Sequence, residues 1–212
     1  MSESAAPVQA PATSVAGLLW PSAAGRTGAA RAVLLAVAGA CILTVSAKVQ
    51  VPGPVPMTLQ TLAVLALGAA LGARLAVASV LLYLVQGAMG LPVFANTPPM
   101  APGLAYFAGP TGGFLSGFLL AAAIVGTAAD RGFVRRPVAF GAVLGVALLA
   151  LLASGWLWLA LAASVGAGSG IGFARAFQLG VQPFLLGEAI KLGIAALSFP
   201  LAYEALARLA RR

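Results

Sequence analysis

The chain has 212 residues, of which 61% are hydrophobic and only 8% are charged, and its mean hydropathy is +1.04. These values exclude an ordinary soluble domain and predict an all-α membrane protein, because lipid offers no hydrogen-bond partners to an exposed backbone. The formal net charge of +8 does not indicate nucleic-acid binding, since the basic residues stand singly or in small groups between apolar runs. With no histidine and one cysteine, we expect no metal site, no catalytic site and no cofactor.

The first half of the chain predicts a tail and three helices. Residues 1–28 are rich in Ala, Pro and Ser and are expected to be a disordered tail, which leaves one membrane domain at 29–209. The first span is expected from about Ala29 to Lys48, close to the roughly 20 residues that a bilayer requires. The apolar stretch 58–91 is expected to form two shorter helices with a turn at 72–74.

The second half predicts three more spans, at 111–129, 138–157 and 184–206, which makes six transmembrane helices in all. A proline-rich loop at 92–109 precedes the first of them, and a Gly/Ser-rich segment followed by a short helical piece precedes the last. Six spans place both termini on one side, and nine of the 12 basic residues fall on that side. The positive-inside rule therefore predicts cytoplasmic termini. The nine residues are Arg26, Arg31, Arg74, Arg131, Arg135, Arg136, Arg208, Arg211 and Arg212.

The three remaining basic residues are Lys48, Arg175 and Lys191, and Lys191 stands three positions after Glu188 in an apolar helix. Residues three apart share a helix face, and charges within a membrane normally face a bundle interior or a wet cavity. One interpretation is an ion pair that only fixes the sixth helix. The other is a polar floor for a ligand, with Lys191 donating hydrogen bonds and Glu188 accepting them.

Other polar positions on the same side are candidate ligand contacts, each with a plainer alternative. Asn96 offers a donor and an acceptor, but it is also a common turn residue. Tyr106 precedes the segment from Gly109 through Thr111, where a helix is expected to begin with its amide groups facing a ligand or with its glycines packed against another helix. Thr58 is predicted to cap a helix or to contact the ligand.

A stiff, extended loop is expected between the first two spans because three prolines alternate there. It is predicted to be a lid over the site or a simple tether. The three residues are Pro52, Pro54 and Pro56.

Small residues repeat every four positions along the first span, a spacing that lets another helix approach closely. They are predicted to form a partner-docking face, with internal packing as the alternative. These residues are Ala32, Ala36 and Ala40.

No G-x-x-x-x-G-K-[ST] loop is present, so we expect any ATP-driven step to come from a partner. The order and spacing of four blocks resemble the BioY family, the biotin-specific S components of energy-coupling factor (ECF) transporters, from about Ala29 to Tyr203. The blocks are Val55–Leu62, Gly87–Phe94, Gly109–Phe114 with Gly117-Phe118, and Pro183-Phe184 with Gly187-Glu188 and Lys191.

The resemblance implies an S-component-like bundle of six helices in the bacterial cell (inner) membrane that captures biotin from outside. Its implied partners are a transmembrane T component, which would dock on the alanine-rich first helix, and paired ATPase subunits. Glu188 and Lys191 match the acid and the lysine of the family's last-helix motif, although the family more often has Asp at the first position. Asn96 lies near a ligand-contacting position of the family.

Three other functions stay open from the sequence. One is an S component for a different vitamin, and another is a secondary carrier that works without an ATPase. The third is a membrane enzyme or structural protein, against which the lack of histidine and the scarcity of acids argue.

Overall fold

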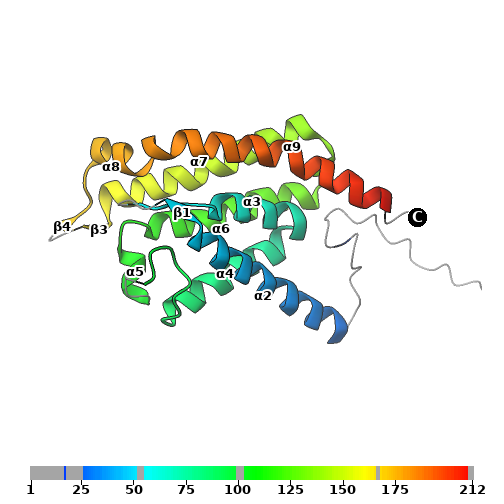
Figure 1. Cartoon of the computed structure of the whole chain (residues 1–212), viewed down its shortest axis with the longest axis horizontal. Coiled ribbons are helices and arrows are strands. Elements are labelled where there is room, and N and C mark those ends of the chain that lie inside the picture. The colour runs from blue at the N-terminus through cyan, green and yellow to red at the C-terminus, as the bar shows by residue number, and fades with distance from the viewer. Residues whose placement is uncertain (1–16, 18–25, 52–54, 99–102, 166–167, 210–212) are drawn as a thin grey trace, which may run out of the picture.

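The computed structural model describes Gly17 and residues 26–51, 55–98, 103–165 and 168–209, and these form a bundle of helices (Figure 1). The predicted all-α class and the count of six main helices are confirmed. The six are α2 (Arg26–Lys48), α3 (Gln60–Leu71), α4 (Ala73–Ala88), α6 (Gly112–Asp130), α7 (Pro137–Leu161) and α9 (Leu185–Leu209). Shorter pieces are α5 (Leu104–Ala108), η1 (Phe133–Arg135), α8 (Phe173–Gly180) and η2 (Gln182–Phe184).

The six helices differ in length. In the described residues, four stretches are long and apolar enough to cross a membrane, namely 27–48, 112–130, 137–161 and 173–209. By contrast, α3 has 12 residues and α4 has 16, fewer than the roughly 20 that a full crossing requires. These two helices therefore depend on the longer ones around them.

The turn between α3 and α4 is a single residue, Gly72, whose φ of +78° suits glycine because a side chain would be strained there. The backbone N–H of Ala73 donates to Oδ2 of Asp130 at 3.0 Å, which fastens this turn to the end of α6. The sequence-based turn at 72–74 is thus confirmed in place and is shorter than expected.

The bundle has two distinct ends (Figure 1). The beginning of α2, the end of α9 and the α3–α4 turn lie toward one end, and η1 joins them there through Arg135, whose Nη2 donates to the hydroxyl of Tyr203 at 2.8 Å. At the other end lie α5, α8 and two small hairpins. The hairpins pair β1 (Gln50–Val51) with β2 (Met57–Thr58), and β3 (Ser164–Val165) with β4 (Gly168–Ser169).

Glycines let α6 and α7 approach closely. A Cβ atom at Gly113 would lie 2.2 Å from Cβ of Trp158 and 2.6 Å from the carbonyl oxygen of Ser154. At Gly117 it would lie 2.9 Å from the carbonyl oxygen of Leu151. The packing interpretation of the glycine-rich segment therefore holds, and this contact forms one wall of the cavity described below.

Three boundaries differ from the sequence-based expectations. The first helix begins at Arg26, inside the expected tail, and α7 continues to Leu161. The expected loop 92–109 contains the helix α5, whose Tyr106 and Phe107 pack on the bundle. Tertiary contacts decide these ends, which local composition marks poorly.

Candidate functional site

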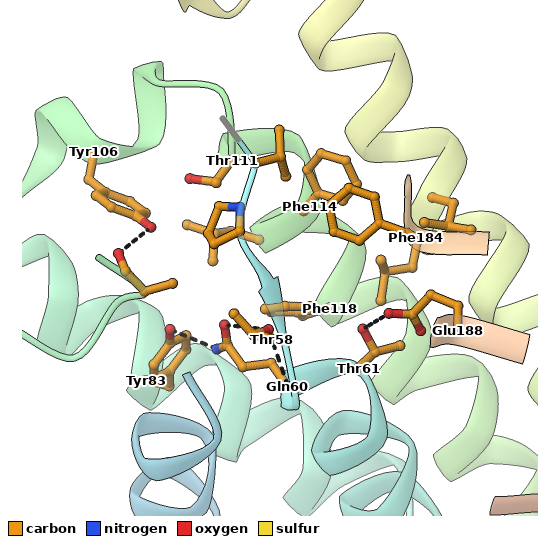
Figure 2. A pocket seen from close by; sticks show the side chains of 16 residues that line it. Thr58, Gln60, Thr61, Tyr83, Tyr106, Thr111, Phe114, Phe118, Phe184 and Glu188 are labelled. Carbon is orange, nitrogen blue, oxygen red and sulfur yellow. Dashed lines mark hydrogen bonds between the residues drawn. The ribbon is translucent and has the colours of Figure 1, made fainter. Parts of the chain in front are cut away.

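A cavity opens between the helices at the end of the bundle that carries α5 and the β1–β2 hairpin (Figure 2). The volume open to water-sized molecules is about 50 Å³. Side chains come from α3, α4, α5, α6, α7, η2 and α9, from strand β2 and from loops between these elements, and most of them are apolar. The lining residues are Val55, Pro56, Thr58, Gln60, Thr61, Tyr83, Ala95, Tyr106, Thr111, Phe114, Leu115, Phe118, Leu151, Leu152, Phe184 and Glu188.

Gln60 and Tyr83 form the first polar group of the cavity. The amide Nε2 of Gln60 donates to the hydroxyl oxygen of Tyr83 at 2.8 Å, and both side chains are buried. Thr58 adds to this group, because its Oγ1 accepts a bond from the backbone N–H of Gln60 at 3.2 Å. Thr58 is not the N-cap of α3, because that position is Leu59 and has no side-chain cap, so the capping interpretation is wrong. Thr58 instead lines the cavity.

Tyr106 forms a second polar contact of the wall. Its hydroxyl donates to the carbonyl oxygen of Ala95 at 2.9 Å, and its ring stacks on Phe94 with centroids 4.5 Å apart. Burial raises the pKa of Tyr106 above its ordinary value, so the phenol stays neutral and keeps its proton for this bond. Tyr106 thus lines the cavity, and its predicted contact with a ligand stays a prediction.

Glu188 lies at the opposite end of the cavity from Gln60 and Tyr83 (Figure 2). Its Oε1 accepts bonds from Nζ of Lys191 at 2.7 Å and from Oγ1 of Thr61 at 3.1 Å. Its Oε2 is buried and has no hydrogen-bond partner in the described structure. A buried acceptor without a partner is costly, so this atom calls for a donor from a bound molecule.

Lys191 stands beside Glu188 on α9, as the spacing predicts, but it does not line the cavity. Its ammonium group donates to Oε1 of Glu188 and, at 2.7 Å, to the carbonyl oxygen of Thr58. Lys191 borders a separate groove beside the β1–β2 hairpin, which it shares with Glu188 and Gln50. It therefore contacts the described cavity through Glu188.

Aromatic rings separate the two polar ends. Phe118 lies between the Gln60 side and the Glu188 side, while Phe114 and Phe184 stack at a centroid distance of 6.2 Å (Figure 2). A ligand for this cavity should therefore be mostly apolar and should carry polar groups at separated positions.

The remaining predicted contacts are placed differently. Thr111 lines the cavity, while Gly109 does not. The carbonyl oxygen of Gly109 accepts the indole N–H of Trp158 at 2.9 Å. Asn96 is also outside the lining and has a φ of +56°, which fits the turn interpretation.

The predicted lid is only partly described. Pro56 lines the cavity beside Val55, whereas Pro52 and Pro54 lie outside the described residues. The lid itself stays a prediction.

The predicted docking face on α2 needs a correction. Ala40 is fully buried, and the adjacent Gly39 lies so close to α4 that a Cβ there would be 2.3 Å from Oγ of Ser79. Ala32 and Ala36 are half-buried, and the exposed residues include Val33 and Val45. A repeat of small residues in the sequence does not distinguish packing against a helix of the same chain from packing against a partner protein.

Sequence reasoning missed part of the polar lining. Gln60, Thr61 and Tyr83 were not predicted to be site residues. A glutamine and a threonine at the start of an apolar helix were a usable signal, because a buried amide requires a partner. Tyr83 gave no such signal, since its pairing with Gln60 spans 23 positions.

Among the described residues, no three His, Cys, Asp or Glu side chains come together as a metal ion would require.

Comparisons with known proteins point to one family. The family model described as the BioY family matches residues 14–208. The probable biotin transporter BioY of Pyrococcus horikoshii is 36% identical over 167 residues, which are 78% of this chain and 92% of that protein. The biotin transporter BioY of Thermotoga maritima is 34% identical over 157 residues, or 74% and 86% of the two chains.

A solved structure has the same fold. It is the S-component for biotin from an ECF-type ABC transporter, with a TM-score of 0.70 and 19% sequence identity. The match covers 90% of this chain and 96% of that one. At this identity the likeness supports the S-component fold that the sequence resemblance implied.

Proposed function

The chain belongs to the BioY family, and we propose on this basis that it is the membrane-embedded biotin-binding subunit of an ECF-type vitamin importer. The observation that carries the proposal is the unpartnered Oε2 of Glu188 on the wall of a mostly apolar cavity. A family name alone does not say where the ligand binds, whereas a buried acceptor without a donor marks a specific place for one.

Biotin has the chemistry that this cavity requires. Its ureido group carries two N–H donors and a carbonyl acceptor, and its sulfur-containing ring is apolar. Glu188 can accept a ureido N–H, and the rings of Phe114, Phe118 and Phe184 can cover the apolar part. At the other end, the Gln60–Tyr83 pair provides an amide and a hydroxyl for a further polar group.

The volume of the cavity adds a requirement. A single water needs roughly 10–15 Å³ of such space. The space of about 50 Å³ therefore holds only a few water molecules. Biotin is larger than a few water molecules, so we expect the walls to move apart when it binds. The walls built from loop residues, such as Val55, Pro56 and Ala95, are expected to move more than the helix–helix wall of α6 and α7.

Energy is proposed to come from partners. The sequence contains no P-loop motif, so we assign ATP hydrolysis to ATPase subunits that act through a T component, and we assign no catalysis and no cofactor to this chain. The outward face of α2 is proposed as the docking surface because it is apolar and exposed, with Val33 at 62% and Val45 at 66%.

We also propose that the chain lies in the bacterial cell (inner) membrane with both termini in the cytoplasm. Arg74 follows the α3–α4 turn, and Arg131 and Arg136 stand on either side of η1. The α3–α4 turn and η1 lie at the end of the bundle where α2 begins and α9 ends, and basic loops favour the cytoplasmic side. The cavity then opens toward the outer side.

The direct test is to purify the chain in detergent from cells grown with biotin, to denature it and to identify the released molecule by mass spectrometry. Biotin in near-equal amount to protein is the expected result. Release of another vitamin would change the proposed substrate but would keep the assignment as an S component. Uptake into proteoliposomes by an ion gradient, with no ATPase present, would instead support a secondary carrier.

A further inference from the structure

Lys48, the last residue of α2, reaches to the turn that follows α4. Its Nζ donates to the carbonyl oxygen of Phe94 at 2.8 Å, to the carbonyl oxygen of Thr97 at 2.5 Å and to Oγ1 of Thr97 at 3.3 Å. An ammonium group has three donors, so these three acceptors use all of them.

The described carboxylates are engaged elsewhere. Glu188 pairs with Lys191, Glu204 pairs with Arg208, and Asp130 accepts a bond from the backbone of α4. Lys48 therefore acts on backbone oxygens of the turn. Hydrogen bonds from a charged donor are stronger than neutral ones, and a cation is favourable at the C-terminal end of a helix.

The turn that Lys48 holds, residues 94–97, is part of the cavity wall. Ala95 lines the cavity, and its carbonyl oxygen accepts the hydroxyl of Tyr106 at 2.9 Å. Phe94 is fully buried and packs against Tyr106 and, at 5.3 Å between centroids, against Tyr83. A displacement of the turn would therefore disturb three residues that line the cavity, namely Ala95, Tyr106 and Tyr83.

Lys48 also adjoins the opposite loop. The next residue, Val49, accepts a backbone bond from Leu59 at 3.0 Å, at the base of the β1–β2 hairpin. That hairpin leads to Val55 and Pro56, which line the cavity. The end of α2 is thus joined to both loop walls of the cavity.

We propose that Lys48 is a positioning residue that fastens the turn 94–97 to the end of α2, so that movement of α2 changes the shape of the ligand cavity. In the proposed function, on which this inference rests for its ligand, α2 carries the docking surface. Lys48 then links partner docking to the release of the bound vitamin. No contact between Lys48 and the ligand is required.

The test compares Lys48→Met with Lys48→Arg in the full chain, purified in detergent. Arg175→Met is the matched control, because Arg175 is an exposed cation of α8 at the same end of the bundle. If Lys48→Met does not fold, Lys48→Gln takes its place, because glutamine has an amide donor on a shorter, uncharged side chain.

The first measurement is hydrogen–deuterium exchange without ligand. Lys48→Met should raise exchange in residues 93–98 and 104–108 but not in the middle of α7, because only the turn and its partner α5 lose their fastening. Lys48→Arg should restore most of the protection, and Arg175→Met should match the wild type. Unchanged exchange at 93–98 in Lys48→Met would overturn the proposal.

The second measurement is the dissociation rate of biotin. Lys48→Met should release biotin about tenfold faster, with a smaller change in the association rate. Increased exchange without faster release would show a purely structural tether and would also overturn the proposal. If the wild type does not bind biotin, the proposed function fails, while the exchange experiment still decides whether Lys48 fastens the wall.

Discussion

Lys191 and Glu188 form a partly buried ion pair at 2.7 Å that leaves the second carboxylate oxygen of Glu188 without a partner beside the cavity. The pair thus combines both interpretations that its spacing allows. It fixes α9 to the β1–β2 hairpin through Thr58, and it orients the carboxylate that we assign to the ligand.

Lys191→Ala should weaken biotin binding at least about tenfold, or about 1.4 kcal/mol, without preventing membrane insertion. The reason is indirect: Glu188 would lose the ammonium that holds its charge and its position. Isothermal titration calorimetry on the purified variant measures the effect. An unchanged dissociation constant would show that Lys191 has no part in the site.

Glu188→Gln should weaken biotin binding more than tenfold, about 1.4 kcal/mol or more, because it removes the charged acceptor and leaves Lys191 without its counter-ion. The matched control is Glu204→Gln, which breaks an exposed pair with Arg208 and should change neither binding nor stability. Equal behaviour of the two variants would contradict the proposed role of Glu188.

Tyr83→Phe should lower the free energy of unfolding by about 1–3 kcal/mol, because the buried amide of Gln60 loses its acceptor. Thermal unfolding of the detergent-purified protein, followed without ligand, is the measurement. A variant as stable as the wild type would mean that water or another group satisfies Gln60.

Ala36→Leu should preserve biotin binding and reduce ATP-driven uptake, because residue 36 is partly exposed on α2. Ala40→Leu should instead destabilise the chain, since Ala40 is fully buried and overpacking costs about 1–3 kcal/mol. Leu149→Trp, on an exposed position of α7, is the control for uptake. Normal uptake by Ala36→Leu would argue against docking at this face.

Gly113→Ala should destabilise the bundle, because the new Cβ would overlap Trp158 and the backbone of Ser154. Gly145→Ala is the matched control on α7, where a Cβ meets nothing within 4 Å and alanine favours a helix. The difference between their unfolding temperatures tests the close contact of α6 and α7. A higher unfolding temperature for Gly113→Ala than for Gly145→Ala would contradict the close contact of α6 and α7.

Local patterns predicted the parts of the fold that local physics controls. The apolar runs indicated six helices, and Gly72 marked the turn between α3 and α4 because its backbone needs a left-handed conformation. The spacing of Glu188 and Lys191 predicted their shared face, because residues three apart on a helix are neighbours.

Contacts between distant segments could not be predicted in this way. Lys48 lies 46 positions from Phe94, and Thr61 lies 127 positions from Glu188. Periodicity also failed for Ala40, which is fully buried, because a small-residue repeat suits contact with a helix of the same chain as well as contact with a partner.

The amino-acid sequence by itself determined a helical membrane protein with basic residues between its apolar runs and an acid–lysine pair in its last helix. It could do so because apolar length and the cost of burying charge act on each segment separately. Only the tertiary structure decided that Gln60 meets Tyr83, that Lys191 stands behind Glu188, and that Lys48 holds the turn 94–97. Those pairings depend on how helices pack against one another, which no single segment encodes.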